Sequence, residues 1–253
     1  MRFIAVASLT LALAELSGCA KPNAARDTQR DSATIAQSVT PRVDRARSDS
    51  SNGRVAPPLE PRKDSITERA DRGRIMGDSS ASVWLVMASD FQCPWCKRWH
   101  DSTFAQVVQN YVRPGKIRLA YLNFPLQMHR NAGPAAEAAM CASVQGRFWE
   151  LHDALFIQQD RWDELPNAMP VLDSIAARTG VSMPAWRSCM STHSTRALIQ
   201  ADRDRAAAAG VQSTPTFFVG DQKVDGYEPY AQFRTVIDAA LAKQGGRAKP
   251  SRP

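Results

Sequence analysis

Cys93 and Cys96 are separated only by a Pro-Trp dipeptide. Two thiols at this spacing can cycle between a dithiol and a disulfide, or they can hold a metal ion. The apolar run from residue 83 to 88 comes just before them and is too short for a helix, so it predicts a buried strand. Apolar residues downstream recur at helical spacing. The pair is therefore expected at a strand-to-helix junction.

This placement puts Cys93 at the N-terminus of the helix, with Pro94 in the first turn, where its missing N–H costs little. Free backbone N–H groups and the positive end of the helix dipole favour a thiolate at that position. We therefore expect Cys93 to be the more exposed sulfur and the nucleophile. Cys96 lies one turn further along and is expected to be the buried resolving thiol. Dithiol chemistry of this kind requires no cofactor.

Zinc binding is the other use of such a pair, and it requires two more ligands at matching spacing. The chain has no second Cys-x-x-Cys motif. None of its four histidines pair as His-x3-5-His: His100, His129, His152 and His193. The sequence therefore predicts no metal site. A copper-handling module that uses Met183, Met190 and His193 stays open as an alternative.

The first residues are typical of an export signal. Arg2 is followed by a mostly apolar stretch that ends in Leu-Ser-Gly-Cys19, which resembles a bacterial lipobox. We expect a lipoprotein signal peptide over residues 1–18 and lipidation of Cys19, which would anchor the protein to a membrane on the periplasmic side of the cell envelope. The alternative is ordinary cleavage, for instance after Ala20, which would give a soluble periplasmic or secreted protein.

Five cysteines are an odd number for an exported protein. Lipidation of Cys19 would remove the odd one and leave two pairs. The expected pairs are a redox-active disulfide between Cys93 and Cys96 and a structural disulfide between Cys141 and Cys189. Two buried free thiols are the alternative for the second pair.

Charge is spread along the chain, whereas composition divides the chain into a tether, a folded domain and a tail. Its formal net charge of +7 is spread, with Lys and Arg scattered among Asp and Glu, which argues against nucleic-acid binding. Residues 19–74 are polar and nearly free of large apolar side chains, so they predict a disordered tether, with a short local helix around Ile66 as an alternative for that stretch. The folded domain is expected over residues 75–246, and residues 247–253 are expected to form a disordered tail.

The folded domain is expected to run strand, helix, strand, helical block, strand, strand, helix. The second strand is predicted at 116–122, and a hairpin is predicted at 217–219 and 223–224. The helical pieces are predicted at 135–144, 147–158, 169–178, 184–192 and 195–209, with a last helix at about 229–243. This order predicts an α/β, thioredoxin-like fold with a helical insertion at about 132–209, between its βαβ and ββα halves.

Three signatures in this order resemble the DsbA-like branch of the thioredoxin superfamily, the exported bacterial thiol–disulfide oxidoreductases. They lie at residues 89–96, at 135–152 and at 210–219. The resemblance covers about residues 75–245 and implies that Pro215 is cis and lies beside the dithiol. It also implies that Thr214 and Pro215 present backbone to an extended substrate chain. Trp95, inside the dithiol turn, is expected to be partly exposed and to contact substrate.

One position departs from the family. Many relatives place a buried carboxylate six residues before the first cysteine, where this chain has Met87. Asp90 is nearer, but strand alternation would point it to the opposite face. Proton transfer to Cys96 is therefore expected to go through water.

The expected function is disulfide formation in secreted proteins by an exported thiol–disulfide oxidoreductase. Its expected partners are cysteine-containing exported proteins and an unidentified membrane redox partner, and it is expected to act as a monomer. A disulfide reductase or isomerase that uses the same dithiol is one alternative. A tethered metal-binding or chaperone module is another.

Overall fold

The structure, a computed structural model, describes residues 65–247. The predicted signal peptide, the lipidation site at Cys19 and residues 19–64 of the predicted tether lie outside the described residues, as does the tail after Arg247. None of the helices between residues 65 and 247 is long and apolar enough to cross a membrane.

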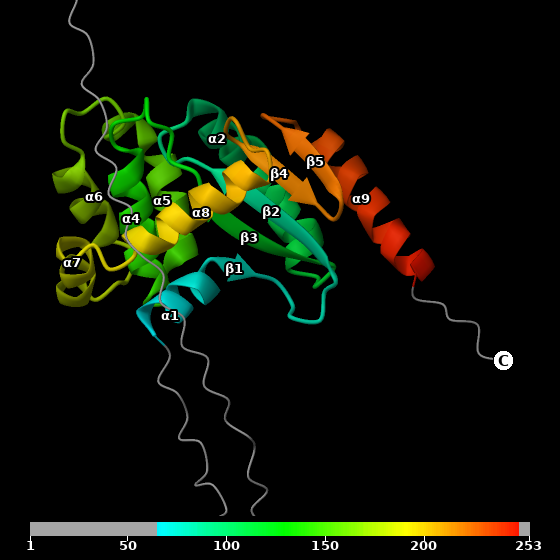
Figure 1. The fold of residues 1–253 in the computed structure, drawn as a ribbon, viewed down its shortest axis with the longest axis horizontal. Coiled ribbons are helices and arrows are strands. Elements are labelled where there is room, and N and C mark those ends of the chain that lie inside the picture. The colour runs from blue at the N-terminus through cyan, green and yellow to red at the C-terminus, as the bar shows by residue number, and fades with distance from the viewer. Residues whose placement is uncertain (1–64, 248–253) are drawn as a thin grey trace, which may run out of the picture. The chain divides into compact units, whose positions relative to one another are not determined.

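A five-stranded sheet with the order β1-β3-β2-β4-β5 lies at the centre of the described part (Figure 1). β2 runs parallel to β3 and antiparallel to β4, and the outer strands β1 and β5 are antiparallel to their neighbours. The strands are β1 (Ile75–Met76), β2 (Val83–Ser89), β3 (Ile117–Asn123), β4 (Thr216–Val219) and β5 (Gln222–Asp225).

The carboxyl end of β2 is buried on both faces, since Met87, Ala88 and Ser89 are all inaccessible. β3 instead alternates between buried and half-buried residues along its length. The chain therefore leaves β2 in the middle of the molecule, at the centre of the sheet, and this is where the predicted dithiol follows.

A long helical segment connects β2 to β3, and its hydrogen bonding switches between α and π geometry. It consists of α2 (Pro94–Trp99), the π-helical η1 (His100–Phe104), α3 (Ala105–Val107) and the π-helical η2 (Val108–Val112). The C-terminal helix α9 (Tyr230–Arg247) packs against this segment and the sheet. Trp99 contacts Phe217 and Phe233 there, with ring centroids 4.7 Å and 5.3 Å away.

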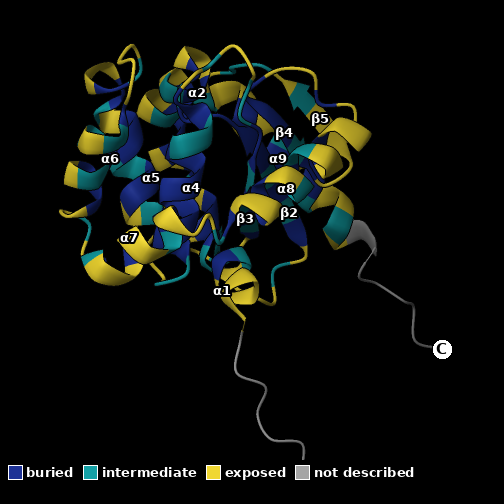
Figure 2. Ribbon diagram, turned by 60° about the vertical axis from the view of Figure 1, so that its left-hand side comes forward, coloured by how far each residue is buried: buried dark blue, intermediate teal, exposed yellow. Residues whose placement is uncertain are grey.

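Five α-helices lie between β3 and β4 in the described chain and form the insertion. They are α4 (Ala132–Ser143), α5 (Phe148–Ile157), α6 (Met169–Ala176), α7 (Met183–Ser191) and α8 (Arg196–Ala208), with a 3-10 turn η3 (Gln159–Arg161) after α5. α4 contacts the other four as well as α1, and it is buried over most of its length (Figure 2). Its alanines suit this position because they favour helix and let neighbouring helices approach closely.

These elements confirm the predicted fold class, a thioredoxin-like α/β fold with a helical insertion between its two halves. The strand predicted at 116–122 and the hairpin after residue 216 are both present within one or two residues. β1 was not predicted, because a two-residue strand is too short to show alternation.

The predicted tether to residue 74 is wrong for residues 65–74, which form part of the fold. Helix α1 (Ile66–Gly73) begins with a capping box, in which the Glu68 N–H donates to Ser65 Oγ at 3.1 Å and the Ser65 N–H donates to Glu68 Oε2 at 2.8 Å. Ser143 Oγ donates to the carbonyl of the fully buried Ala70 at 2.6 Å. The segment is held by polar contacts and close helix packing, so its lack of large apolar residues was misleading.

Arg74 completes this attachment. Its guanidinium is buried and pairs with the carboxylates of Asp202 in α8 and Asp71 in α1. Asp202 also accepts a hydrogen bond from the side-chain amide of Asn123 at 2.8 Å. The pairing gives a buried cation its counter-charge and joins α1, β3 and α8.

Candidate active site

The turn after β2 places Cys93 at the start of α2. Asp90 organises it, since its Oδ1 accepts the Gln92 N–H at 2.7 Å and its carbonyl accepts the Cys93 N–H at 3.1 Å. Cys93 is the N-cap residue, with extended φ and ψ of −70° and 125°, and Pro94 is the first helical residue. The structure therefore has the predicted strand-to-helix junction, with the first thiol at the helix N-terminus.

Cys93 and Cys96 are present as two free thiols. Cys93 is 3% exposed and Cys96 is 2% exposed, so the predicted order of exposure holds but the difference is small. The two thiols differ instead in the groups around them. The Cys96 thiol and, to a smaller extent, the Thr214 side chain and backbone N–H groups of α2 outweigh burial and lower the pKa of Cys93 to about 6. Burial, followed by the interaction with Cys93, raises the pKa of Cys96 well above its usual value.

At neutral pH this arrangement makes Cys93 a thiolate while Cys96 keeps its proton. The lowering of the Cys93 pKa from 9.0 to about 6 corresponds to about 4 kcal/mol of thiolate stabilisation. A helix terminus supplies at most about 2 kcal/mol. Direct hydrogen bonds to the sulfur must therefore supply much of the effect.

The loop before β4 lies against Cys93. The Thr214–Pro215 peptide bond is cis, as the family resemblance implies. Cys93 Sγ lies 3.3 Å from the carbonyl oxygen of Thr214. Thr214 is buried, and its hydroxyl has no hydrogen-bond partner among the described residues. The structure thus brings together the predicted site residues Cys93, Cys96, Thr214 and Pro215.

Trp95 stands at the surface of the site and is 53% exposed, in line with its predicted partial exposure. Its ring stacks on Tyr227 at a centroid distance of 6.5 Å. The Arg98 guanidinium lies 5.6 Å from the Trp95 ring and 5.0 Å from the Tyr227 ring. Tyr227 comes from the connection between β5 and α9, and no local sequence pattern pointed to it.

Several polar residues that support the turn were also missed by sequence reasoning. Gln159 Nε2 in η3 donates to the carbonyls of Phe91 and Cys93 at 2.6 Å and 3.3 Å. His129 Nδ1, in the loop after β3, lies 2.7 Å from Asp90 Oδ2. These contacts join segments that are far apart in the sequence, so no local pattern predicts them. Only His129 stood out in the sequence, because the chain has few histidines.

Within residues 65–247 one group of side chains has the spacing of a metal site: His100, His152 and Asp153. His100 Nε2 and His152 Nδ1 both bond to the same carboxylate oxygen of Asp153, at 3.2 Å and 2.8 Å. These hydrogen bonds satisfy the carboxylate without an ion, and we assign the group no metal role. Burial lowers the pKa of His152 to about 4.

Two of the three residues of the copper alternative lie at a cavity of about 610 Å³ in the insertion. Met190 and His193 line this cavity, whereas Met183 is not among its lining residues. His193 Nδ1 is bonded to Glu137 Oε2 at 2.7 Å.

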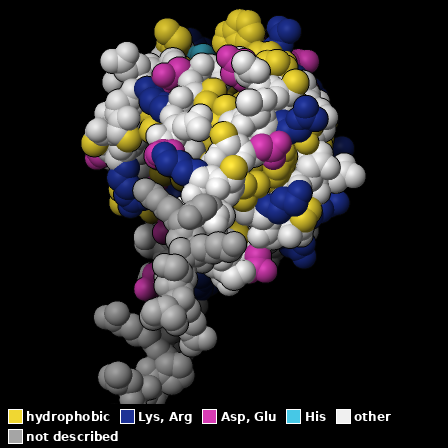
Figure 3. Space-filling model, turned by 90° about the vertical axis from the view of Figure 1, so that its right-hand side faces the viewer, with side chains coloured by type: hydrophobic (Ala, Val, Ile, Leu, Met, Phe, Trp, Pro, Cys, Tyr) yellow, Lys and Arg dark blue, Asp and Glu magenta, His cyan; other side chains and the backbone are white. Residues whose placement is uncertain are grey.

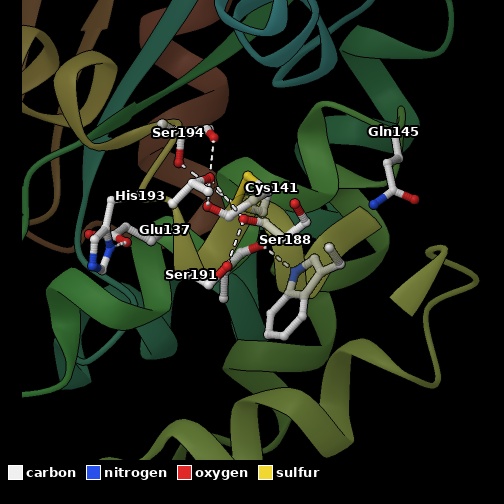
Figure 4. Close-up of a disulfide and its surroundings, with 12 residues drawn as sticks. Glu137, Cys141, Gln145, Ser188, Ser191, His193 and Ser194 are labelled. Carbon is white, nitrogen blue, oxygen red and sulfur yellow. Dashed lines mark hydrogen bonds and ion pairs between the residues drawn. A yellow bond between two sulfur atoms is a disulfide. The ribbon is translucent and has the colours of Figure 1, made fainter. Parts of the chain in front are cut away.

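A disulfide joins Cys141 in α4 to Cys189 in α7, with their Cα atoms 5.8 Å apart (Figure 4). The predicted pairing is therefore present, rather than two free thiols. It crosslinks two helices of the insertion and takes no part in the dithiol site.

Charged side chains are spread over the face of the molecule that Figure 3 shows. On the face shown in Figure 3, Lys and Arg lie apart from one another among hydrophobic and acidic side chains. This is the scattered distribution that the charge pattern of the sequence predicts.

A thiol pair that starts the helix after a central strand, beside a cis-proline loop, defines a thioredoxin-fold site. The family model described as thioredoxin matches residues 69–239, and the chain belongs to this family. Its fold is the DsbA-like form. Wolbachia pipientis alpha-DsbA1 superimposes with a TM-score of 0.63 at 23% identity, over 70% of this chain and 94% of that one.

Two relatives of known sequence extend the comparison. The chain is 22% identical over 174 residues to disulfide bond formation protein D of Bacillus subtilis, across 66% of this chain and 76% of that protein. It is 32% identical over 185 residues to the Na(+)/H(+) antiporter NhaA 3 of Salinispora tropica, across 70% of this chain. The chain spans only 27% of that antiporter's length.

Proposed function

We propose that this protein is an exported thiol–disulfide oxidoreductase that forms disulfides in secreted proteins through Cys93 and Cys96. The main support is the pairing of a stabilised Cys93 thiolate, with a pKa of about 6, with a buried Cys96 thiol whose pKa is raised. A thiol with a low pKa is a good leaving group, so a disulfide that releases it is a strong oxidant. The kinship with disulfide bond formation protein D is further support.

The reaction begins with the oxidised enzyme. A substrate thiolate attacks Cys93 Sγ, the Cys93–Cys96 bond breaks, and its electron pair goes to Cys96, which takes up a proton because of its raised pKa. A second substrate thiolate then attacks the substrate sulfur of the mixed disulfide. Cys93 leaves as a thiolate, the substrate has lost two electrons, and the enzyme holds the reduced pair. A membrane redox partner would restore the disulfide.

The substrate chain would pass the loop of Thr214 and Pro215. The carbonyl of Thr214 already lies 3.3 Å from Cys93 Sγ, so a peptide joined to that sulfur must lie along this backbone. The exposed ring of Trp95 offers an apolar contact on the other side of the sulfur. The proposed substrates are cysteine-containing exported proteins, met by a monomer that is anchored through Cys19.

The reduction potential tests this proposal. Purified protein is equilibrated with glutathione buffers, and the redox state of the dithiol is read by gel shift. The oxidase function requires a potential above that of thioredoxin, about −270 mV. A value at or below that would favour the reductase alternative.

Oxidation of a reduced, unfolded substrate protein is the matching activity assay. Cys93→Ala should abolish it, whereas the double variant Cys141→Ala/Cys189→Ala removes the same type of residue and keeps the dithiol. Full activity of Cys93→Ala would reject the thiol mechanism. Titration of the reduced protein with copper tests the metal-binding alternative.

A further inference from the structure

A buried carboxylate lies in the turn that carries the nucleophile. The side chain of Asp90 is fully inaccessible. Its Oδ1 accepts the Gln92 N–H, and its own carbonyl accepts the Cys93 N–H at 3.1 Å. Asp90 therefore cannot move away from Cys93 without disrupting the turn.

This placement is electrostatically unfavourable by itself. A negative charge near a thiol disfavours the thiolate, and the effect grows where water is excluded. Three N–H groups bond to the carboxylate, from Gln92, Leu126 and His129, at 2.7 Å, 2.9 Å and 2.7 Å. Backbone N–H groups solvate a carboxylate but do not neutralise its charge, so only the imidazole of His129 can do so.

His129 is the ion-pair partner of Asp90 among the described residues, and it comes from the loop after β3. Its side chain is 18% exposed, so it can exchange protons with solvent. The charged groups that face the imidazole are the Asp90 carboxylate and, less strongly, the Cys93 thiolate, and the hydrogen bond with Asp90 is the main cause that raises the pKa of His129. Both neighbours favour the imidazolium.

We propose that protonated His129 is a positioning residue of the dithiol, whose positive charge offsets the buried Asp90 carboxylate and so permits a thiolate at Cys93. The Cys-Pro-Trp-Cys turn carries no cation between its cysteines. Lys97, the first cation after them, is bonded to Asp101 and to the carbonyl of Phe156. The compensating charge is instead supplied by a loop distant in sequence. The importance of this charge for substrate oxidation rests on the proposed function. Its effect on the pKa of Cys93 does not.

A purely structural role for His129 would need only a hydrogen bond to Asp90, made equally well by a neutral ring. The two roles differ in one respect. If the imidazolium interacts with the Cys93 thiolate, each group must feel the charge of the other to the same extent, because binding of the two protons is thermodynamically linked.

The first experiment needs no variant. The imidazole of His129 is titrated by NMR in the reduced and in the oxidised protein, since oxidation removes the Cys93 charge. The pKa of His129 should be higher in the reduced protein, and the ring signals of His193, which bonds to Glu137 at the same 2.7 Å, are followed as the control. Equal values for His129 in both states would overturn the proposal.

The second experiment uses variants. His129→Gln keeps a hydrogen-bond donor but loses the charge, and it should raise the pKa of Cys93, followed by ultraviolet thiolate absorbance, by about one unit or more. His193→Asn is the control, because it removes a histidine that also bonds to a carboxylate, on the α7–α8 connection. In the double variant Asp90→Asn/His129→Gln, the pKa of Cys93 should return most of the way to its value in the unmodified protein, since the negative charge that His129 offsets is gone.

The outcomes separate the two proposals. A Cys93 titration in His129→Gln that matches His193→Asn would reject the role of His129. If the unmodified protein does not oxidise substrates, the proposed function is rejected. The NMR and thiolate titrations can still be interpreted in that case. If His129→Gln does not fold, as judged by thermal unfolding, the NMR comparison decides alone.

Discussion

Cys93 Sγ lies 3.3 Å from the carbonyl oxygen of Thr214. In this position the carbonyl accepts from the thiol and favours its protonated form. The hydroxyl of the same threonine is buried and has no partner among residues 65–247. After the larger effect of the Cys96 thiol, the Thr214 side chain contributes to the lowered pKa of Cys93. The carbonyl of Thr214 thus accepts from the thiol, and its unpartnered hydroxyl is available to donate to the thiolate.

Thr214→Val should therefore raise the pKa of Cys93 and weaken the enzyme as an oxidant. Valine keeps the shape of threonine but loses the hydroxyl, and a hydrogen bond to a charged group contributes about 1.5 kcal/mol or more, which is about one pKa unit. Thiolate absorbance against pH measures the shift, and glutathione equilibration measures the fall in potential. Thr214→Ser is the control that keeps the donor. Identical titrations of the valine and serine variants would contradict the assignment.

The disulfide between Cys141 and Cys189 should stabilise the insertion without affecting the dithiol. Its cysteines are 48 residues apart, so the chain-entropy model gives about 4 kcal/mol as an upper estimate. Cys189→Ala should lower the free energy of unfolding in urea by up to that amount and leave the Cys93 titration unchanged. Because either single variant already breaks the bridge, Cys141→Ala/Cys189→Ala should lose little more. Additive losses would mean that packing, rather than the crosslink, is responsible.

Local sequence patterns predicted those parts of the site that are formed by residues close together in the sequence. The apolar run before Cys93, the proline after it and the helical spacing beyond are all short-range signals, and they correctly placed the thiol at a helix N-terminus. The helices of the insertion were predictable for the same reason. The alternation argument for Asp90 did not apply, because β2 ends at Ser89 and Asp90 belongs to the turn.

Contacts between distant segments left no such signal. The bonds from His129 to Asp90 and from Gln159 to the Cys93 carbonyl exist only once the loop after β3 and η3 are folded against the turn. The π-helical segments after α2 are changes in backbone hydrogen bonding, which have no residue signature. The attachment of α1 to the folded domain was missed because polar groups rather than apolar side chains hold it there.

His152 should make the protein less stable in mild acid. Its ring is fully buried among aromatic rings, including Phe104 and Trp149 at centroid distances of 5.0 Å each, and burial lowers its pKa to about 4. An unfolded histidine titrates near pH 6.5. Between these values the unfolded chain binds a proton that the folded chain does not. The contribution of His152 to the free energy of unfolding is therefore fully present above about pH 6.5. It declines towards pH 4, by up to about 3 kcal/mol.

Urea unfolding across this pH range measures the effect. His152→Gln cannot titrate but keeps a donor for Asp153, so its stability should depend less on pH than that of the unmodified protein. His193→Asn, at an exposed position, should keep the original slope. If His152→Gln retains the full acid sensitivity, another group is responsible.

The sequence predicts that the mature protein starts at a lipidated Cys19, a position outside the described residues. Intact-mass analysis of protein extracted from membranes should show a mature chain that begins at Cys19 and carries the mass of a lipid. Cys19→Ser should release the protein from the membrane fraction. A mature chain that lacks Cys19, or that carries it unmodified, would favour ordinary signal-peptide cleavage.

The two active-site thiols should differ clearly in their reactivity towards alkylating agents. With a pKa of about 6, Cys93 should be alkylated at a rate that rises to a plateau around that pH, because only the thiolate reacts. Cys96 should stay unmodified under the same conditions, since burial keeps its thiol protonated. Cys96→Ala should accumulate mixed disulfides with proteins that carry a disulfide: the Cys93 thiolate attacks that disulfide, one substrate sulfur leaves as a thiolate, and no Cys96 thiol remains to attack Cys93 Sγ and release the substrate. The alanine also removes the hydrogen bond that contributes most to the low pKa of Cys93, so the alkylation midpoint of this variant should move to higher pH. Mass spectrometry of quenched reactions locates the alkylated and trapped cysteines. Trapping through Cys96 in a Cys93→Ala variant, at the rate seen for Cys93, would reverse the assignment of nucleophile and resolving thiol.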